Sequence, residues 1–98
     1  MYGTIARLHA KPGMQDRLME LGSQESVRRM PGFVSQYVYR SDADPEEYYL
    51  AVVFDSKEAY CANADSLEQD ASYRRLRELL TDDPEWHDGE VVTALFAI

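Results

Sequence analysis

The sequence has almost no cysteine, since Cys61 is the single one among 98 residues. An internal disulfide is therefore impossible, and a reducing, cytoplasmic location is the simplest expectation. Cys61 falls among small residues of an expected helix, where a free cysteine usually acts as a buried small hydrophobe. No histidine lies near it in the sequence, so a nucleophilic role has little support.

The chain is also poor in basic residues. Lysine and arginine number 10 against 18 aspartates and glutamates, which gives a formal net charge of -8. Nucleic-acid binders need a basic surface and anionic membranes attract basic segments, so we expect neither partner. No apolar run is as long as a membrane span, and the first residues lack the basic and apolar regions of a signal peptide.

Metal-binding patterns are scarce as well. His9 and His87 are the only histidines, and the acidic segment 82–88 lacks the glycine and the ligand spacing of a calcium loop. No glycine-rich loop precedes a helix, so the usual phosphate-binding signal is missing. We therefore expect no metal and no bound cofactor.

The stretch 48–54 is the clearest structural signal that is present. It contains only aromatic, aliphatic and β-branched residues and is bounded by turn residues at 44–45 and 55–56. Such a run is typical of a strand that is covered on both faces. Asp55 or Ser56 then supplies an N-cap oxygen for a following helix.

Periodicity places the other elements around this strand. In chain order we expect a strand at 2–9, a helix at 14–29 that bends at Gly22, a strand at 33–41, the strand at 48–54, helical sequence from 57 to 80 interrupted at 65–66, and a last strand at 90–97. This order predicts one domain over residues 1–98 with an α+β, ferredoxin-like βαββαβ fold and a four-stranded antiparallel sheet. The helices of this fold cover one face only, so the apolar opposite face favours a symmetric homodimer packed sheet against sheet.

Several short motifs occur at spacings found in one known family. They are Lys11-Pro12-Gly13 after the first strand, Pro31-Gly32-Phe33 at the second, the segment FDSKEAY at 54–60, and Ser66 before the helix that carries Tyr73. In order and spacing, over nearly the whole chain, the sequence resembles an antibiotic biosynthesis monooxygenase (ABM) domain of the dimeric α+β barrel superfamily. The resemblance implies this fold and a small hydrophobic or aromatic ligand. Members of the superfamily include cofactor-free oxygenases, haem-degrading enzymes and isomerases, so the fold alone does not select an activity.

Two departures from the family pattern bear on activity. Phe54 stands where the family commonly has tryptophan, and it fills the same apolar space without the indole N–H donor. Haem-degrading relatives use asparagine, tryptophan and histidine at positions that align with Ala6, Asn63 and Tyr73. None of these three residues is of the expected type, so haem cleavage is not expected.

The resemblance and the strand alternation together suggest a pocket between the sheet and its helices. Strict alternation gives Phe33, Tyr37 and Tyr39 one shared face, which is one candidate lining of this pocket. The resemblance puts Thr4 and Ala6 on the helix-facing side of the first strand, where small side chains leave room for a ring. A role in the aromatic core or in dimer contacts is the alternative for each tyrosine.

Three further side chains are candidates for the chemistry. Tyr73 carries a hydroxyl on the inner stripe of the last helix, where it needs a partner, and it is the leading catalytic candidate. His9 can act as a general base near neutral pH, although alternation puts it on the face opposite Thr4 and Ala6. Trp86 lies in an acidic loop that either folds over the pocket as a lid or places this side chain as a plug for the core or for the partner chain.

These observations favour a small homodimeric oxygenase that acts on an aromatic or quinol-type substrate without a metal or prosthetic group. The protein would supply an apolar pocket, a base or hydrogen-bond partner, and donors for the substrate oxygens. Two alternatives stay open. One is a non-catalytic module that sequesters a small hydrophobic molecule, and the other is an isomerase or lyase of the same superfamily.

Overall fold

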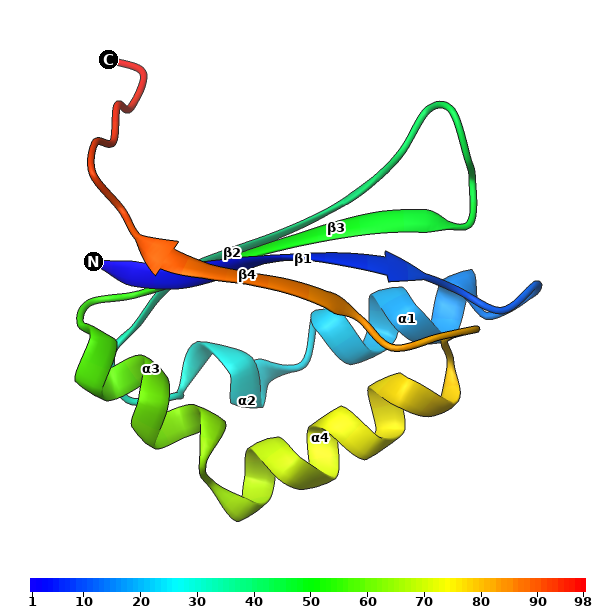
Figure 1. Cartoon of the computed structure of the whole chain (residues 1–98), viewed down its shortest axis with the longest axis horizontal. Helices are drawn as coiled ribbons and strands as arrows, with labels where there is room; N and C mark the ends of the chain where they lie inside the picture. The colour runs from blue at the N-terminus through cyan, green and yellow to red at the C-terminus, as the bar shows by residue number, and fades with distance from the viewer.

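The computed structural model describes the whole chain, from Met1 to Ile98. It contains four strands and four helices (Figure 1). In chain order these are β1 (Tyr2–His9), α1 (Gln15–Gly22), α2 (Glu25–Arg28), β2 (Phe33–Arg40), β3 (Glu47–Phe54), α3 (Lys57–Ala64), α4 (Leu67–Glu78) and β4 (Glu85–Glu90).

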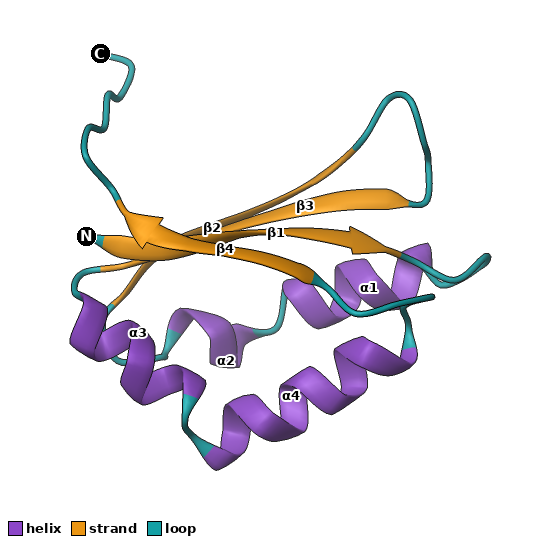
Figure 2. Ribbon diagram, viewed as in Figure 1, coloured by secondary structure: helices purple, strands orange, loops and turns teal.

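The strands form one antiparallel sheet in the order β2-β3-β1-β4. The helices all lie on one face of this sheet and leave the opposite face, called the open face below, without a covering layer (Figure 2). The ferredoxin-like α+β fold with a four-stranded antiparallel sheet is therefore confirmed. None of the helices has the length and apolar character that a membrane-spanning segment requires.

Serine caps begin the two later helices. Ser56 Oγ accepts a hydrogen bond from Ala59 N at 3.1 Å, and Ser66 Oγ accepts one from Gln69 N at 3.1 Å. Each serine satisfies one of the N–H groups that the first turn of a helix leaves free. The interruption expected between these two helices is confirmed. The single helix expected over 14–29 with a bend at Gly22 is instead two helices, because α1 ends at Gly22 and α2 begins at Glu25.

Alternate residues of β1 form the floor of the core. Thr4, Ala6 and Leu8 are buried against the helix layer, whereas Ile5 and Arg7 are exposed on the open face. This alternation confirms the helix-facing position expected for Thr4 and Ala6. The buried cluster consists of Ala6, Leu8, Ala10, Leu18, Tyr48 and Leu80.

The last strand does not lie where the sequence predicts it. β4 covers the polar segment Glu85–Glu90, while the β-branched and aliphatic segment after it has no regular secondary structure. The expectation of a strand at 90–97 is therefore wrong. Trp86 and His87, expected in a loop, belong to β4 instead.

Pairing at both ends of β1 explains this position. Lys11 N donates to Leu79 O at 2.8 Å and Thr81 N donates to His9 O at 2.9 Å, which ties the end of α4 to one end of β1. The residues after Thr81 therefore run antiparallel to β1 from its C-terminal end. β4 pairs first with Arg7 and reaches the N-terminal end of β1 where Glu90 pairs with Tyr2. Later residues have no strand of their own chain left to pair with, so pairing overrides intrinsic β propensity.

A β-bulge in β2 changes which of its side chains face the helices. The pairing with β3 shifts between Phe33 and Ser35, so strict alternation is broken there. Phe33 packs edge to face on Phe54 with 6.1 Å between ring centroids, whereas Tyr37 and Tyr39 are 68% and 57% exposed on the open face. The prediction that Phe33, Tyr37 and Tyr39 share one pocket-facing side is therefore wrong.

Cys61 is exposed, so the expectation of a buried small side chain at this position is wrong. The reason lies in the helical period of α3. Tyr60 and Asn63 on this helix face the sheet side and line a cavity there. A residue next to Tyr60 is rotated by about 100° around the helix, and Cys61 consequently points to solvent.

The open face and the C-terminal segment 91–98 carry exposed apolar side chains. Ile5 and Tyr37 are exposed on the open face, and Leu95 and Phe96 are 95% and 86% exposed in the segment beyond β4. Figure 1 shows this segment rising from the end of β4 on the side of the sheet away from the helices. A lone chain therefore leaves exposed apolar side chains of the sheet and an apolar segment uncovered on the same side.

Candidate functional site

A cavity of about 940 Å³ lies between the sheet and the helices. Helix-facing side chains of the four strands form its floor, and all four helices contribute to its walls. The apolar part of the lining includes Leu8, Leu18, Leu21, Val27, Met30, Val38, Leu50, Val52, Phe54 and Leu76. Small-molecule sites commonly range from about 300 to 1,000 Å³, so this cavity has room for a fused aromatic ring system.

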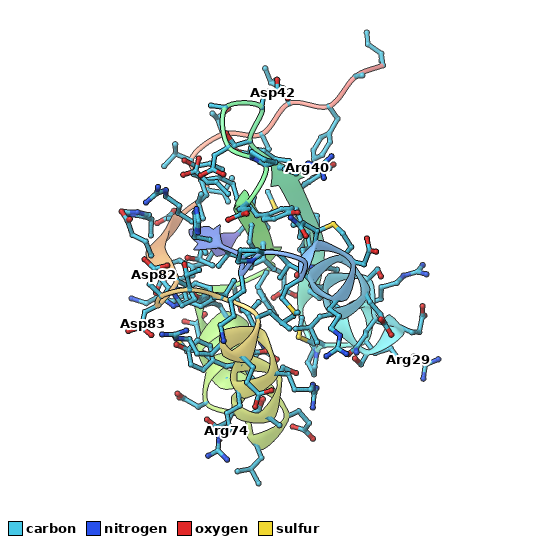
Figure 3. All side chains as sticks on the ribbon, turned by 90° about the vertical axis from the view of Figure 1, so that its right-hand side faces the viewer. Arg29, Arg40, Asp42, Arg74, Asp82 and Asp83 are labelled. Carbon is cyan, nitrogen blue, oxygen red and sulfur yellow. The ribbon has the colours of Figure 1, made fainter.

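Many charged side chains lie at the periphery of the molecule. Figure 3 shows Arg74 projecting from the helix layer, and Asp82 and Asp83 projecting from the loop before β4. Arg74 pairs with Asp70 at 2.9 Å along α4, where both side chains are more than half exposed. An exposed pair of this kind contributes little to stability and leaves the cavity mainly apolar.

The two later helices supply polar side chains to one side of the cavity. Asn63 of α3 and Tyr73 of α4 both line it, together with Gln69. Asn63 Nδ2 donates to Gln69 Oε1 at 3.4 Å, while no other side chain of the protein engages the hydroxyl of Tyr73. The half-buried Tyr73 hydroxyl is therefore free to bond a ligand oxygen.

Tyr60 and Asp88 form a hydrogen-bonded pair at the edge of the cavity next to β4. Tyr60 Oη donates to Asp88 Oδ1 at 2.9 Å, and both residues line the cavity. Edge-to-face contacts hold the Tyr60 ring, with centroid distances of 5.2 Å to Tyr2 and 5.8 Å to Phe54. Burial, followed by the bond to Asp88, raises the pKa of Tyr60 to about 12. The phenol consequently stays protonated at neutral pH and remains the donor of this pair.

Thr4 lies beside this pair and has an unusual hydroxyl. β1 and β4 place Thr4 directly opposite Asp88, and Thr4 is only 5% exposed. Its Oγ1 atom is buried without a hydrogen-bond partner, whereas buried hydroxyls nearly always have one. The Thr4 hydroxyl lies near Tyr60 Oη without forming a hydrogen bond of normal geometry, and as a donor toward that oxygen it lowers the pKa of Tyr60 by less than burial and Asp88 raise it.

Part of the site predicted from the sequence comes together in this cavity. Thr4, Phe54, Tyr73 and Trp86 all line it. Trp86 does so from β4, where it pairs with Ala6, so the lid, which was one of its two expected roles, does not fit its place in the sheet. Ala6 is fully buried in the floor beneath the cavity, where its small side chain leaves space above the sheet.

The remaining predicted residues lie outside the cavity. His9 is the clearest case, because its ring nitrogens lie 3.1 Å from Asp44 Oδ2 and 3.2 Å from Thr81 Oγ1, away from the cavity lining. Phe33 supports Phe54 from the side without reaching the cavity. Tyr37 and Tyr39 belong to the open face, as described above. The proposed base His9 is therefore out of reach of a ligand between sheet and helices.

Sequence analysis missed Tyr60 and Asp88. Tyr60 belongs to the FDSKEAY segment and precedes Asn63 by three residues, which puts both on one side of a helix. This spacing was a usable signal for Tyr60. Asp88 gave no such signal, because the face on which it lies is set by β4. The last strand was expected to begin at Glu90, whereas β4 begins five residues earlier, at Glu85.

The cavity thus combines an apolar interior with two polar points. One is the Tyr60–Asp88 pair beside Thr4, and the other is formed by Asn63 and Tyr73 from the helices. No group of three or more histidine, cysteine, aspartate or glutamate side chains converges in the structure as metal ligands would. An aromatic ring that carries oxygen substituents suits this arrangement, because the ring matches the interior and the oxygens can reach hydrogen-bonding groups.

Comparisons with known proteins point to one family. The family model described as antibiotic biosynthesis monooxygenase matches residues 1–75. A solved structure of a candidate antibiotic biosynthesis monooxygenase from Chloroflexus aurantiacus is similar, with 27% identity, a TM-score of 0.80, and coverage of 97% of this chain and 96% of that chain. SnoaB from Streptomyces nogalater, named a cofactor-independent oxygenase, has 18% identity and a TM-score of 0.82, with coverage of 96% and 95%. A candidate family member from Deinococcus radiodurans has 17% identity and a TM-score of 0.82, with coverage of 100% and 99%. No curated protein matches the sequence.

Proposed function

Because the chain belongs to the antibiotic biosynthesis monooxygenase family, we propose that it oxidises an aromatic, quinol-type small molecule without a bound metal or prosthetic group. The observation that carries this proposal is the apolar cavity of about 940 Å³ with tyrosine hydroxyls in its lining. SnoaB, which has the same fold, is named a cofactor-independent oxygenase, and its chemistry supports the same reaction class here.

Such a reaction needs little more than a proton acceptor and a shaped, apolar site. An electron-rich ring that loses a proton to the solvent becomes an anion, this anion can react with O₂ directly, and the proton is recovered in the water that the reaction releases. At a methylene carbon of an anthrone-type ring, one oxygen atom becomes the new carbonyl oxygen and the other leaves as water. Asn63 and Tyr73 both line the cavity, and in this proposal they donate hydrogen bonds to the ring oxygen on which negative charge develops.

A passive binding module is the second candidate for this cavity. That function requires a closed apolar pocket that no tyrosine, histidine or arginine reaches. Tyr60 and Tyr73 both line the cavity, and the Tyr73 hydroxyl is free to bond a ligand. The lining therefore favours a site that acts on the oxygens of its ligand over one that only encloses an apolar molecule.

Oxygen uptake with a panel of quinols and anthrones tests the oxygenase proposal. We expect the purified protein to accelerate uptake for at least one compound, and no acceleration over buffer for any of them would count heavily against it. Tyr73→Phe should slow the reaction by about 100-fold, because it removes one hydrogen-bond donor from the developing anion. Ser23→Ala removes a hydroxyl that donates to Met19 O at the end of α1, outside the cavity lining, and should leave the rate within about twofold. Turnover under strict anaerobiosis would indicate an isomerase or lyase instead.

We also propose that the active form is a homodimer joined through the open face. Ile5, Tyr37 and Tyr39 expose apolar surface there, and the segment 91–98 contains no charged residue and rises on the same side (Figure 1). A chain of about 100 residues buries a modest core, so a second copy that covers this surface adds stability. In this dimer the segment 91–98 of each copy packs on the other copy. A cytoplasmic location, expected from the single cysteine, stays a prediction.

A further inference from the structure

One edge of the cavity has no role in the oxygen chemistry proposed above. It lies where α3 meets β1 and β4, and it contains Tyr60, Asp88 and Thr4. We propose that the Tyr60–Asp88 pair is a binding subsite that accepts a hydrogen bond from a hydroxyl group of the ligand and disfavours ligands with a carboxylate at that position. The inference rests on the proposed function only in taking the ligand to be an aromatic small molecule.

The hydrogen-bonding capacity of this pair sets its preference. The one hydrogen of the Tyr60 hydroxyl is committed to Asp88 Oδ1 at 2.9 Å. Tyr60 Oη then retains only acceptor capacity toward a ligand, and the second oxygen of Asp88 is an acceptor too. Both groups therefore present lone pairs to the cavity. A ligand hydroxyl can donate to them, whereas an ether or a carboxylate cannot.

Thr4 gives independent support for a polar group at this position. The buried side-chain oxygens without a partner are Thr4 Oγ1 and Tyr48 Oη, and of these two residues only Thr4 lines the cavity. A buried hydroxyl without a partner costs about 1–3 kcal/mol. Because Thr4 pairs with Asp88 across the strands and neighbours Tyr60, a ligand hydroxyl that donates to the pair would still have lone pairs to accept a hydrogen bond from Thr4 Oγ1.

The pair is held in place before any ligand binds. The register between β1 and β4 fixes Asp88 opposite Thr4, and the rings of Tyr2 and Phe54 contact the Tyr60 ring edge to face. Little conformational freedom is therefore lost when a ligand binds, which is the condition under which a hydrogen bond adds measurably to affinity.

The charge of the lining acts in the same direction. Glu68, Asp70 and Asp88 line the cavity, and Arg29 is the single basic residue in the lining. An anionic ligand placed beside Asp88 would meet a like charge at close range, and because Asp88 is exposed, water screens this repulsion in part. The site should therefore distinguish a phenol from the carboxylate of the same ring.

Binding of three naphthalene compounds tests this inference without any turnover. Dissociation constants of 1-naphthol, 1-methoxynaphthalene and 1-naphthoate are measured by calorimetry or fluorescence on the full chain under anaerobic conditions at pH 7. We expect 1-naphthol to bind about tenfold more tightly than 1-methoxynaphthalene, because only the former donates to a charged acceptor. We expect 1-naphthoate to bind more weakly than both.

A matched pair of variants assigns this preference to Asp88. Asp88→Asn retains an oxygen that can accept from Tyr60 but removes the charge, so it should weaken 1-naphthol and strengthen 1-naphthoate until their affinities differ by less than about threefold. Glu85→Gln removes the same charge from the same strand on the open face and should leave both affinities within about twofold. Circular dichroism verifies that both variants are folded.

Each outcome has a defined meaning. Equal affinities of 1-naphthol and 1-methoxynaphthalene would overturn the subsite while leaving the oxygenase proposal intact. An equal effect of Glu85→Gln and Asp88→Asn would show that net charge alone causes the discrimination, which also overturns the subsite. If none of the three compounds binds, the cavity does not accept a fused aromatic ring, and both proposals fail together.

Discussion

Replacing Gly32 with alanine should destabilise the protein through two separable effects. Gly32 has a φ of +79°, a left-handed conformation that costs residues with a Cβ about 1–2 kcal/mol. An added Cβ would also lie 2.6 Å from Ala59 Cβ and 2.8 Å from Asp55 Oδ1. The carbonyl of Gly32 accepts a 2.8 Å hydrogen bond from Asp55 N, which holds this junction of β2, β3 and α3 in place.

Gly13 allows the two effects to be measured apart. Its φ is +81°, but an added Cβ would have no atom within 4 Å. Gly13→Ala should therefore lower the free energy of unfolding by about 1–2 kcal/mol through backbone conformation alone. Overpacking adds roughly 1–3 kcal/mol, so Gly32→Ala should cost about 2–5 kcal/mol in total. A domain of this size has about 5–15 kcal/mol of stability, and the variant should stay folded with a reduced margin.

Urea unfolding followed by circular dichroism measures both costs, at one fixed protein concentration because the proposed dimer makes stability concentration-dependent. A second substitution, Ala59→Gly, removes the atom that the new Cβ meets at 2.6 Å. In the double-mutant cycle with Gly32→Ala we expect a favourable coupling of about 1–2 kcal/mol. Equal costs for Gly13→Ala and Gly32→Ala, or strict additivity in the cycle, would refute the steric part of this reasoning.

Three further predictions address titration and assembly. Burial raises the pKa of Tyr60 to about 12, so an ultraviolet difference titration of wild type against Tyr60→Phe should show this phenol ionising well above 10.0. The stability that the protonated phenol contributes is complete below pH 10.0 and is lost as pH rises through 12. The backbone N–H of Glu46 holds the pKa of Asp44 below 3.8. The stability that the Asp44 carboxylate contributes is therefore present above pH 3.8 and is lost as pH falls through the folded-state pKa. In an acid unfolding curve, Asp44→Asn should flatten the dependence of stability on pH in this range. Light scattering should give the wild type twice the 11.3 kDa chain mass, and the double substitution Leu95→Asp and Phe96→Asp should give a monomer with an unchanged circular dichroism spectrum. A wild type that is already monomeric would contradict the dimer.

Elements with a strong local signal were predictable from the sequence. The strand at 2–9 has the expected bounds, since alternation and the turn at Lys11-Pro12-Gly13 define both its faces and its end. The serine caps at Ser56 and Ser66 were also readable, because a cap depends only on residues within one helical turn. In each case the physical cause and its effect lie a few residues apart in the chain.

The misplaced last strand and the misplaced tyrosines of β2 depend on distant residues. Nothing local in the sequence EWHDGE indicates a strand, and β4 forms there because β1 offers it a partner from Arg7 to Tyr2. The bulge after Phe33 likewise appears only when β2 is paired with β3, and it moves Tyr37 out of the predicted site. Two residues of the predicted site, Tyr37 and Tyr39, were therefore misplaced because alternation along a single strand carries no information about a bulge in its pairing.

One strand register links the ligand subsite with the free C-terminal segment. Pairing of Glu90 with Tyr2 puts Asp88 opposite Thr4 on the helix-facing side. The same pairing uses up β1, with a last hydrogen bond from Val91 N to Met1 O at 2.9 Å, and so releases the apolar segment that follows. A slip of one residue would turn Asp88 to the open face and would separate it from Tyr60. A second copy that binds the released segment would hold the end of β4 against β1, and would thereby stabilise the register on which the subsite depends.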